Sequence, residues 1–277
     1  MIGLKSESLL IKLFAVLSVL QLLTFYNFSC SQELRIVKEW RVRNIVDATS
    51  DIEGNLYISD EQGTLSKYNK DGLLLLTYSG NTISPIYSVD VSKTAKVFGF
   101  YKDHQSYLLL DRHLSLLHEA GLNSGLIGYA TVTAFAADNN LWIFDQSDFS
   151  LKKVDLLNDL IITVISLPLI INQEEWDIRQ IKEYQNRLYL YNSDKEVYVF
   201  DNLGNFIKKL PIKPECQFWL HGENLVYSEG TGIYFSNLYS DQIRKIGTIE
   251  NSNNIIKVIY INNFLYLISK NKITIYR

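Results

Sequence analysis

The sequence predicts an all-β fold, a six-bladed β-propeller built of four-stranded antiparallel blades, from a repeat and from its turn chemistry. A hydrophobic pair inside a strand-like run recurs about every forty residues. The six pairs are Leu56–Tyr57, Val97–Phe98, Leu141–Trp142, Leu188–Tyr189, Leu225–Val226 and Leu265–Tyr266. Strand-rich units of this period indicate propeller blades, because one four-stranded sheet cannot bury both of its faces unless neighbours stack on them.

Within each unit the runs predict four strands, with the pair on the second strand. A third run follows and usually stops at Asp or Asn, which bond to their own turn and tolerate left-handed backbone. A fourth apolar run then leaves the turn. The third runs are 65–68, 107–110, 151–154, 197–200 and 233–235, and the fourth runs are 73–76, 114–117, 160–164, 206–210 and 243–246.

The last unit lacks a fourth strand, because the chain stops at Arg277 directly after a third run at 273–276. An alternating run at 34–40 precedes the first complete unit. We expect this N-terminal strand to pair with the C-terminal blade and close the ring, which leaves no open sheet edge at the join. The predicted propeller domain therefore spans 34–277. Trp40 should pack between the first and last blades.

The first 31 residues have the layout of a bacterial secretory signal peptide. Lys5 and Lys12 precede an uncharged stretch at 13–28 and the small residues Ser29, Cys30 and Ser31. The segment predicts an exported protein of the periplasm or cell envelope. Two alternatives stay open: the segment is kept as a membrane anchor, or Cys30 is lipidated as in bacterial lipoproteins. Cleavage of the leader and lipidation of Cys30 would each remove Cys30 from disulfide chemistry. Cys216 would then be the single remaining cysteine, so we expect no disulfide.

The charge of the chain argues against one class of partner. Net charge is −3 at pH 7, whereas nucleic-acid binding requires a basic surface that neutralises phosphates. We therefore expect no nucleic-acid partner, and contact with a membrane only through the N-terminal segment.

The phrases at 48–60 and 136–145 share an inner strand, an Asp or Asn turn and a hydrophobic–aromatic pair followed by Asp. In these phrases the chain resembles six-bladed propellers of the NHL-like and TolB-like group. More closely, it is similar to an uncharacterised family of exported bacterial propellers that share the stretches 45–51 and 145–154. The resemblance implies the fold and leaves the function open, because propellers host binding, scaffolding and hydrolytic roles.

Four acidic residues are candidates for a metal site. Calcium-dependent lactonases also use six-bladed propellers, with oxygen ligands converging on the ion in the central channel. The corresponding candidates are Asp51, Asp90, Asp138 and Glu183, each near the end of a predicted inner strand. Their other interpretation is as turn residues of the blades. His104, His113, His118 and His221 lack zinc-ligand spacing and are interpreted as structural or surface residues.

Candidates for catalysis and binding are few. No Gly-x-Ser-x-Gly motif occurs, and Cys216 with His221 five residues later is interpreted as a small buried residue rather than a nucleophile. Trp176 and Trp219 lie in predicted loops, where exposed aromatic rings contact proteins or glycans; their other interpretation is as filling between blades. The prediction is an envelope module that binds or scaffolds a protein, glycan or small ligand without a cofactor. The alternative is a metal-dependent hydrolase of the lactonase type.

Overall fold

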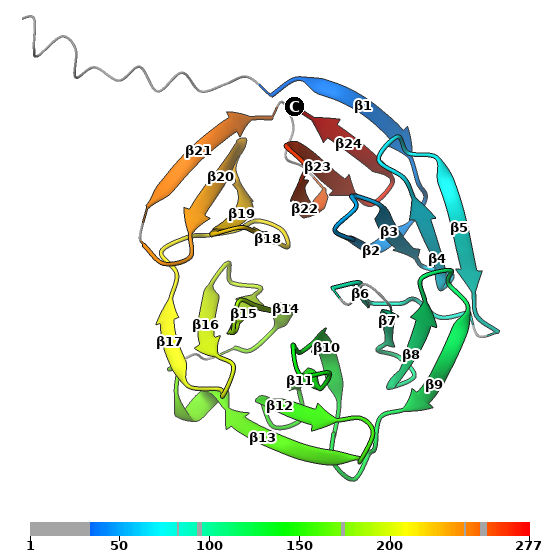
Figure 1. The fold of residues 1–277 in the computed structure, drawn as a ribbon. Helices are drawn as coiled ribbons and strands as arrows, with labels where there is room; N and C mark the ends of the chain where they lie inside the picture. The colour runs from blue at the N-terminus through cyan, green and yellow to red at the C-terminus, as the bar shows by residue number, and fades with distance from the viewer. Residues whose placement is uncertain (1–33, 82, 93–95, 173–174, 241, 250–253) are drawn as a thin grey trace, which may run out of the picture. The chain divides into compact units, whose positions relative to one another are not determined.

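The sheets of the propeller follow one another along the chain in a ring, as Figure 1 shows for the computed structural model. The structure describes residues 34–277 except 82, 93–95, 173–174, 241 and 250–253. These residues form six antiparallel sheets of four strands each, which confirms the predicted fold class. The predicted leader at 1–31, with Cys30, lies outside the described residues.

Blades 1 to 3 come first in the chain, and the strands of each run in order from the channel outward. Blade 1 contains β2 (Ile45–Ser50), β3 (Leu56–Asp60), β4 (Thr64–Tyr68) and β5 (Leu74–Ser79). Blade 2 contains β6 (Ser88–Asp90), β7 (Lys96–Tyr101), β8 (Ser106–Asp111) and β9 (Leu116–Gly121). Blade 3 contains β10 (Ala130–Phe135), β11 (Leu141–Asp145), β12 (Ser150–Asp155) and β13 (Leu160–Ser166).

A short 3-10 turn, η1 (Leu167–Leu169), leads from blade 3 to blade 4. Blade 4 contains β14 (Ile178–Tyr184), β15 (Arg187–Asn192), β16 (Val197–Asp201) and β17 (Phe206–Lys209). Blade 5 contains β18 (Trp219–His221), β19 (Asn224–Glu229), β20 (Gly232–Asn237) and β21 (Ile243–Thr248). Blade 6 contains β22 (Ile255–Ile261), β23 (Phe264–Ser269), β24 (Lys272–Tyr276) and, as its outer strand, β1 (Ile36–Arg41). Among the described residues, no helix has the length and apolar character needed to cross a membrane.

The repeated hydrophobic pair explains how the blades stack. Successive side chains of a strand face opposite sides of its sheet. Leu56 therefore packs in the cluster between blades 6 and 1, whereas its neighbour Tyr57 packs in the cluster between blades 1 and 2. The described residues form six such clusters, one at each blade junction. Each pair thus supplies one side chain to the junction on either side of its blade.

Turns after the third strands follow the predicted chemistry. The Asn69 side chain accepts hydrogen bonds from the N–H groups of Asp71 and Leu73, both at 2.9 Å. Asp201 accepts from Leu203 and Asn205 in the same way, at 2.9 and 2.8 Å. A polar side chain at this position therefore fixes the hairpin that carries the outer strand.

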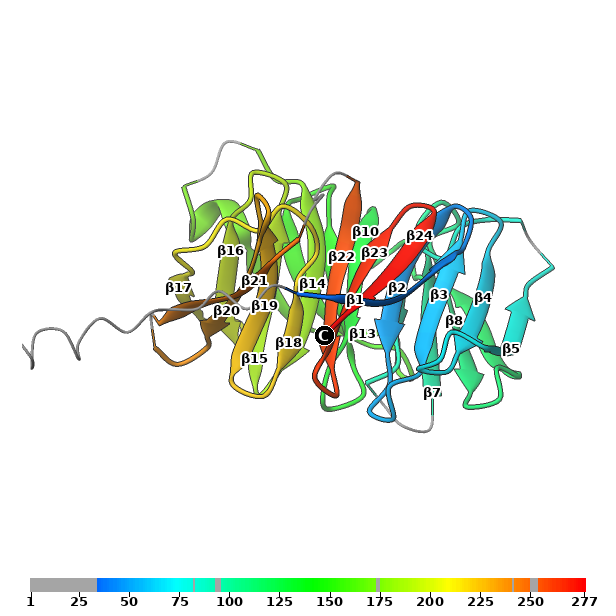
Figure 2. The same cartoon turned by 90° about the horizontal axis from the view of Figure 1, so that it is seen from above.

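The ring closes as the sequence predicts. β1 pairs antiparallel with β24, so that Ile36 lies opposite Tyr276 and Lys38 lies opposite Ile275. Backbone hydrogen bonds between Arg35 and Arg277, at 3.1 and 3.0 Å, extend this pairing to the last residue. Figure 2 shows β1 crossing the outside of the ring beside β24.

Trp40 packs at the junction of the first and last blades, as expected. Its half-buried ring lies against the cluster between blades 6 and 1, with its centroid 6.4 Å from that of Tyr68. A Cβ atom at Gly72, which has a φ of +68°, would lie only 3.1 Å from the indole. The β4–β5 turn therefore requires glycine both for its backbone and for the space that Trp40 occupies.

We predict that Trp40→Ala lowers the free energy of unfolding by about 3 kcal/mol, the low end for large-to-small changes, because the ring is only half-buried. Val37→Ala, on the exposed face of the same strand, is the matched control and should change stability by less than about 0.5 kcal/mol. Urea denaturation of both variants measures the difference. Equal midpoints for the two would contradict the role of Trp40 in closing the ring.

Candidate functional site: the central channel

The inner strands of all six blades line one channel with a volume of about 630 Å³. This size lies within the range of small-molecule sites, about 300–1,000 Å³. The inner strands carry isolated charged and amide side chains among apolar residues, so polar groups occur at several positions along the channel wall. Thr131 and Thr133 on β10 also line the channel, and the structure gives their hydroxyls no hydrogen-bond partner among the described residues.

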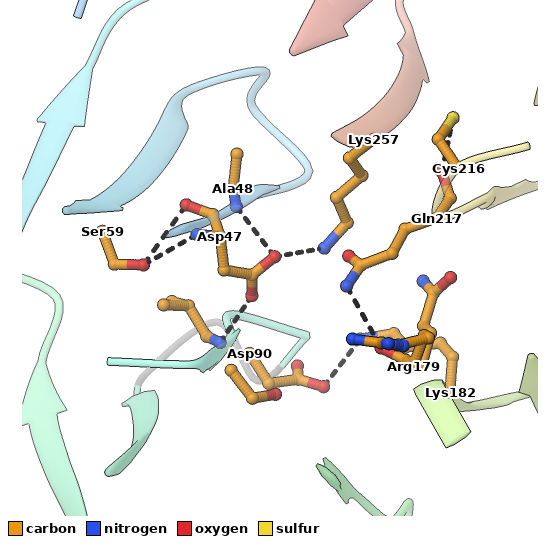
Figure 3. Close-up of polar contacts among 12 residues, drawn as sticks. Asp47, Ala48, Ser59, Asp90, Arg179, Lys182, Cys216, Gln217 and Lys257 are labelled. Carbon is orange, nitrogen blue, oxygen red and sulfur yellow. Dashed lines mark hydrogen bonds and ion pairs between the residues drawn. The ribbon is translucent and has the colours of Figure 1, made fainter. Parts of the chain in front are cut away.

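Asp47 on β2 joins three blades at the channel wall. Its buried carboxylate accepts hydrogen bonds from the N–H of Val89 on blade 2 and of Ala48, both at 2.8 Å. The Lys257 ammonium on blade 6 lies 2.7 Å from the same carboxylate. Figure 3 shows these contacts around Asp47. Asp47 therefore ties the first blade to its neighbours on both sides.

A second ion pair reaches past an intervening blade. Lys182 on β14 of blade 4 lies 2.6 Å from Asp90 on β6 of blade 2, and blade 3 stands between them in the ring (Figure 3). Burial disfavours the Asp90 carboxylate, but the Lys182 ammonium and the hydrogen bonds from Ser92 outweigh that cost. The pKa of Asp90 therefore lies below its ordinary value.

Side-chain amides connect blades 4 and 5, and backbone hydrogen bonds connect blades 5 and 6. The Gln180 amide exchanges two 3.0 Å hydrogen bonds with the backbone of Phe218, as a neighbouring strand would. The Gln217 amide donates to the Arg179 carbonyl at 3.2 Å (Figure 3). The backbone of Gln217 in turn bonds to Ile256 and Val258, at 3.0 Å each. These contacts hold the inner strands at fixed separations around the channel.

The charges lining the channel balance. Within the described part of the chain, four acidic and four basic side chains line it. Asp177 pairs with Arg179 at 2.5 Å, and Asp51 lies 3.7 Å from Lys67. Lys102 lies over the Tyr87 ring, 4.6 Å from its centroid. The lining acids are Asp47, Asp51, Asp90 and Asp177, and the lining bases are Lys102, Arg179, Lys182 and Lys257.

The four carboxylates singled out from the sequence do not converge. Asp51 and Asp90 line the channel, but Asp51 bonds to the N–H groups of its own hairpin. Asp138 also lies in a hairpin and pairs with Lys153 at 2.6 Å. Glu183 accepts from Trp142 Nε1 at 2.7 Å and so joins blade 4 to blade 3. Among the described residues, no group of three or more His, Cys, Asp or Glu side chains is placed to hold a metal ion.

The two tryptophans proposed for binding have different positions. Trp176 is only 5 % exposed and packs on Tyr198 between blades 3 and 4, with ring centroids 5.8 Å apart. The expectation that Trp176 is an exposed loop residue is therefore wrong: its apolar ring fills a blade junction although its sequence neighbours are charged. Trp219 is half-buried on β18 and lines the channel.

Cys216 is buried, and its Sγ lies 3.1 Å from Ser228 Oγ. Burial raises the pKa of its thiol to about 11. A thiol in this environment stays protonated at neutral pH and is a poor nucleophile.

Sequence reasoning missed the lysines that neutralise the channel acids. Lys257 is the one charge in the apolar run 255–261, and Lys182 is one of the charges in the inner strand 178–184. A single lysine inside an apolar strand is a signal of a buried ion pair, because an unpaired buried ammonium is costly. Its partner is not readable from sequence, since Asp47 and Lys257 are 210 residues apart.

Comparisons with known proteins support the fold and do not identify a family. No family model and no curated protein matches the chain. Among solved structures, virginiamycin B lyase from Staphylococcus aureus aligns with a TM-score of 0.61 and 13 % identity over 88 % of this chain and 99 % of that one. Another structure of that lyase, in a catalytically inactive form, holds quinupristin.

Two eukaryotic propellers are similar as well. The Cps50 (Swd1) propeller domain of Myceliophteria thermophila aligns with a TM-score of 0.64 and 11 % identity, over 88 % of this chain and 99 % of that one. The Pan2 WD40 domain of Neurospora crassa aligns with a TM-score of 0.60 and 8 % identity, over 89 % of this chain and 95 % of that one. At these identities the likeness establishes the propeller fold alone.

We predict that Lys182→Met destabilises the protein at pH 7 by about 3 kcal/mol, because it leaves the buried Asp90 carboxylate without its partner. In the wild type the lowered pKa of Asp90 contributes stability above the unfolded pKa of about 3.9, which is lost as the pH falls through the folded value. In the variant, protonation relieves the unpaired charge, so its deficit relative to wild type should shrink on acidification.

Urea midpoints between pH 7 and pH 3 measure this convergence. Lys195→Met removes one partner of the exposed Lys195–Glu215 pair and is the control, with a change of less than about 1 kcal/mol. A deficit for Lys182→Met that stays constant with pH would show that the Asp90–Lys182 pair does not contribute as described.

Proposed function

We propose that this chain is an exported binding module of the cell envelope, which holds a protein segment or small ligand at its central channel and acts as a scaffold. The observation that carries this proposal is the channel itself. It has the volume of a ligand site, and side chains from all six blades line it. A channel that is lined by residues of six blades is suited to ligand binding, because side chains from several blades can contact one bound group.

The pairing of the channel carboxylates with lysines favours a binding function over a catalytic one. Asp47 and Asp90 are each paired with a lysine at 2.7 and 2.6 Å. A carboxylate held in such a pair is a weak general base, because its lone pairs are occupied, and the pKa of Asp90 is also lowered by Lys182. The same pairs supply fixed hydrogen-bond donors and acceptors along the wall, which a binding site needs.

The alternative function is a metal-dependent hydrolase of the lactonase type. It would require Asp51, Asp90, Asp138 and Glu183, or some of them, to turn toward one point. Asp138 instead pairs with Lys153 within blade 3, and Glu183 accepts a hydrogen bond from Trp142 across the junction of blades 3 and 4. Calcium-dependent turnover of a lactone that Asp51→Asn abolishes would establish this alternative.

Export and anchoring belong to the same proposal. The basic, apolar and small-residue segments at 1–31 support secretion, and Cys30 is the residue that a lipid would modify. A partner in the envelope would then meet a propeller held at the membrane surface or released into the periplasm.

Site-specific photo-crosslinking tests the proposal. A photoreactive residue in place of Arg179, whose exposed side chain lines the channel, should give a discrete crosslinked product in envelope fractions. The same residue in place of Lys245, exposed on the outer strand β21, is the control and should give none. Crosslinking that is equal at the two positions, or that is absent at Arg179 while lactone turnover is present, would contradict a channel-binding module.

A further inference from the structure

The inner strands carry a repeated set of contacts between neighbouring blades. On each inner strand, one residue lies opposite the second member of the hydrophobic pair. We call the residue two positions before it the link residue of its blade. The six link residues are Asp47, Ser88, Val132, Gln180, Gln217 and Lys257, and all but Val132 are polar.

Polar link residues join five of the six blade junctions along the channel. Asp47 joins blade 1 to blades 6 and 2, and Gln180 and Gln217 join blades 4, 5 and 6, through the contacts described above. The Ser88 hydroxyl donates to the Thr133 carbonyl at 3.1 Å and so joins blades 2 and 3. The junction of blades 3 and 4 is the one at which the link residue is apolar.

Val132 interrupts the set of links at the junction of blades 3 and 4. Its side chain has no donor or acceptor, and it packs against the apolar cluster of that junction. On blade 4, Ile181 holds the register position from which Val89 and Phe218 donate their N–H groups to link residues. Val132 offers the Ile181 N–H no acceptor, and we call this place the 3–4 gap.

Two threonines flank Val132 on β10. Thr133 is only 2 % exposed, and neither its hydroxyl nor that of Thr131 has a hydrogen-bond partner among the described residues. Thr131 lies at a β-bulge, because the register of β10 shifts between Ala130 and Val132, and bulges often re-aim side chains beside functional sites. Both threonines line the channel together with Val132 and Ile181. Unpaired hydroxyls therefore lie beside the 3–4 gap.

We infer that the ligand of the channel carries an uncharged amide group, which takes the place of the missing link between blades 3 and 4. The inference rests on the proposed channel-binding function and names the chemistry of the bound group. Gln180 shows how an amide fits such a position, because at the next junction it exchanges a donor and an acceptor with the backbone of Phe218. A bound amide accepts from the Ile181 N–H and donates to a threonine hydroxyl of β10.

The charges of the channel wall select an uncharged group. Each of the four lining acids already has a basic partner, at 2.5 to 3.7 Å, and Lys102 lies over the Tyr87 ring of blade 2. A charged ligand at the 3–4 gap would lack a free counterion, and an aliphatic ligand would leave the hydroxyls unpaired. Two sources share the required chemistry: the main chain of a peptide that enters the channel, and a small carboxamide.

Titration of the ¹⁵N-labelled protein, followed by NMR, tests the inference. The probes are acetyl-triglycine amide, which represents a peptide, and acetamide, which represents a small carboxamide. Binding should shift the amide resonances of Ile181 and Thr133 saturably. A peptide probe that binds about tenfold more tightly than acetamide, or better, identifies a peptide main chain as the source. Equal or weaker binding of the peptide probe identifies a small carboxamide.

Val132→Gln supplies the missing link from the chain itself. Its amide should occupy the 3–4 gap and weaken binding of the probe about tenfold or more, because the bound amide and the new side chain compete for the same partners. Val46→Gln places the same side chain at the channel wall of blade 1, where the links are complete. It is the matched control and should change the affinity by less than about twofold.

A second variant keeps the test decisive if Val132→Gln does not fold. Replacement of Thr131 and Thr133 by Val removes both unpaired hydroxyls at nearly constant volume and should also weaken binding about tenfold, whereas Thr49→Val on blade 1 should not. No saturable shift with either amide probe, a shift with maltose alone, or equal effects of a variant and its control would overturn the inference. A crosslink from Arg179 together with any of these results would leave the channel-binding module standing, so the two proposals fail separately.

Discussion

Pairing of β1 with β24 is the constraint on which the rest of the structure depends. A four-stranded blade is apolar on both faces, so it is covered only when a blade stands on each side of it. Blade 6 is complete only when β1 supplies its outer strand, and Trp40 then packs on Tyr68 of blade 1. Closing the ring in this way also fixes the six inner strands around one channel. The site is therefore a consequence of the closure, because no single blade contains it.

The channel wall shows how a propeller can keep charged groups near its axis. Asp47 and Asp90 are buried, which alone would disfavour their carboxylates, but each lies within hydrogen-bond distance of a lysine from another blade. Burying a paired charge costs far less than burying a single one, and removing one partner exposes the full cost. The pairs therefore hold specific blades together, and they present ordered polar groups to anything that enters the channel. Trp219 adds an aromatic surface to the same wall.

Much of the fold could be predicted from local sequence. The hydrophobic pairs sit where adjacent side chains must serve two junctions, and the Asp and Asn turns recur because their side chains bond to their own hairpins. The missing fourth strand of the last unit, together with the run at 34–40, was enough to predict the closure. These features depend on neighbours within a few residues, or on a count of strands.

The site was less predictable, since it depends on contacts between distant blades. Asp90 and Lys182 are 92 residues apart, and nothing in either segment indicates the other. Glu183 looked like a channel acid because it lies near the end of an inner strand, yet it bonds to Trp142 on the neighbouring blade. Trp176 looked exposed because its neighbours are charged, although its ring fills a junction. The sequence shows where along a strand a residue lies. It does not show which residue of another blade the side chain contacts, because that depends on how the blades pack in the ring.

Amide hydrogen exchange of the intact protein tests the closure most directly. If β1 is an integral part of blade 6, the β1 amides that bond to β24 should exchange together with those of β24, through the same opening and as slowly as those of β23, whereas the outward-facing amides of this edge strand exchange fast in either case. Exchange of the β24-facing amides of β1 within seconds while β23 stays protected would show that the ring is held without this strand, and would contradict the account.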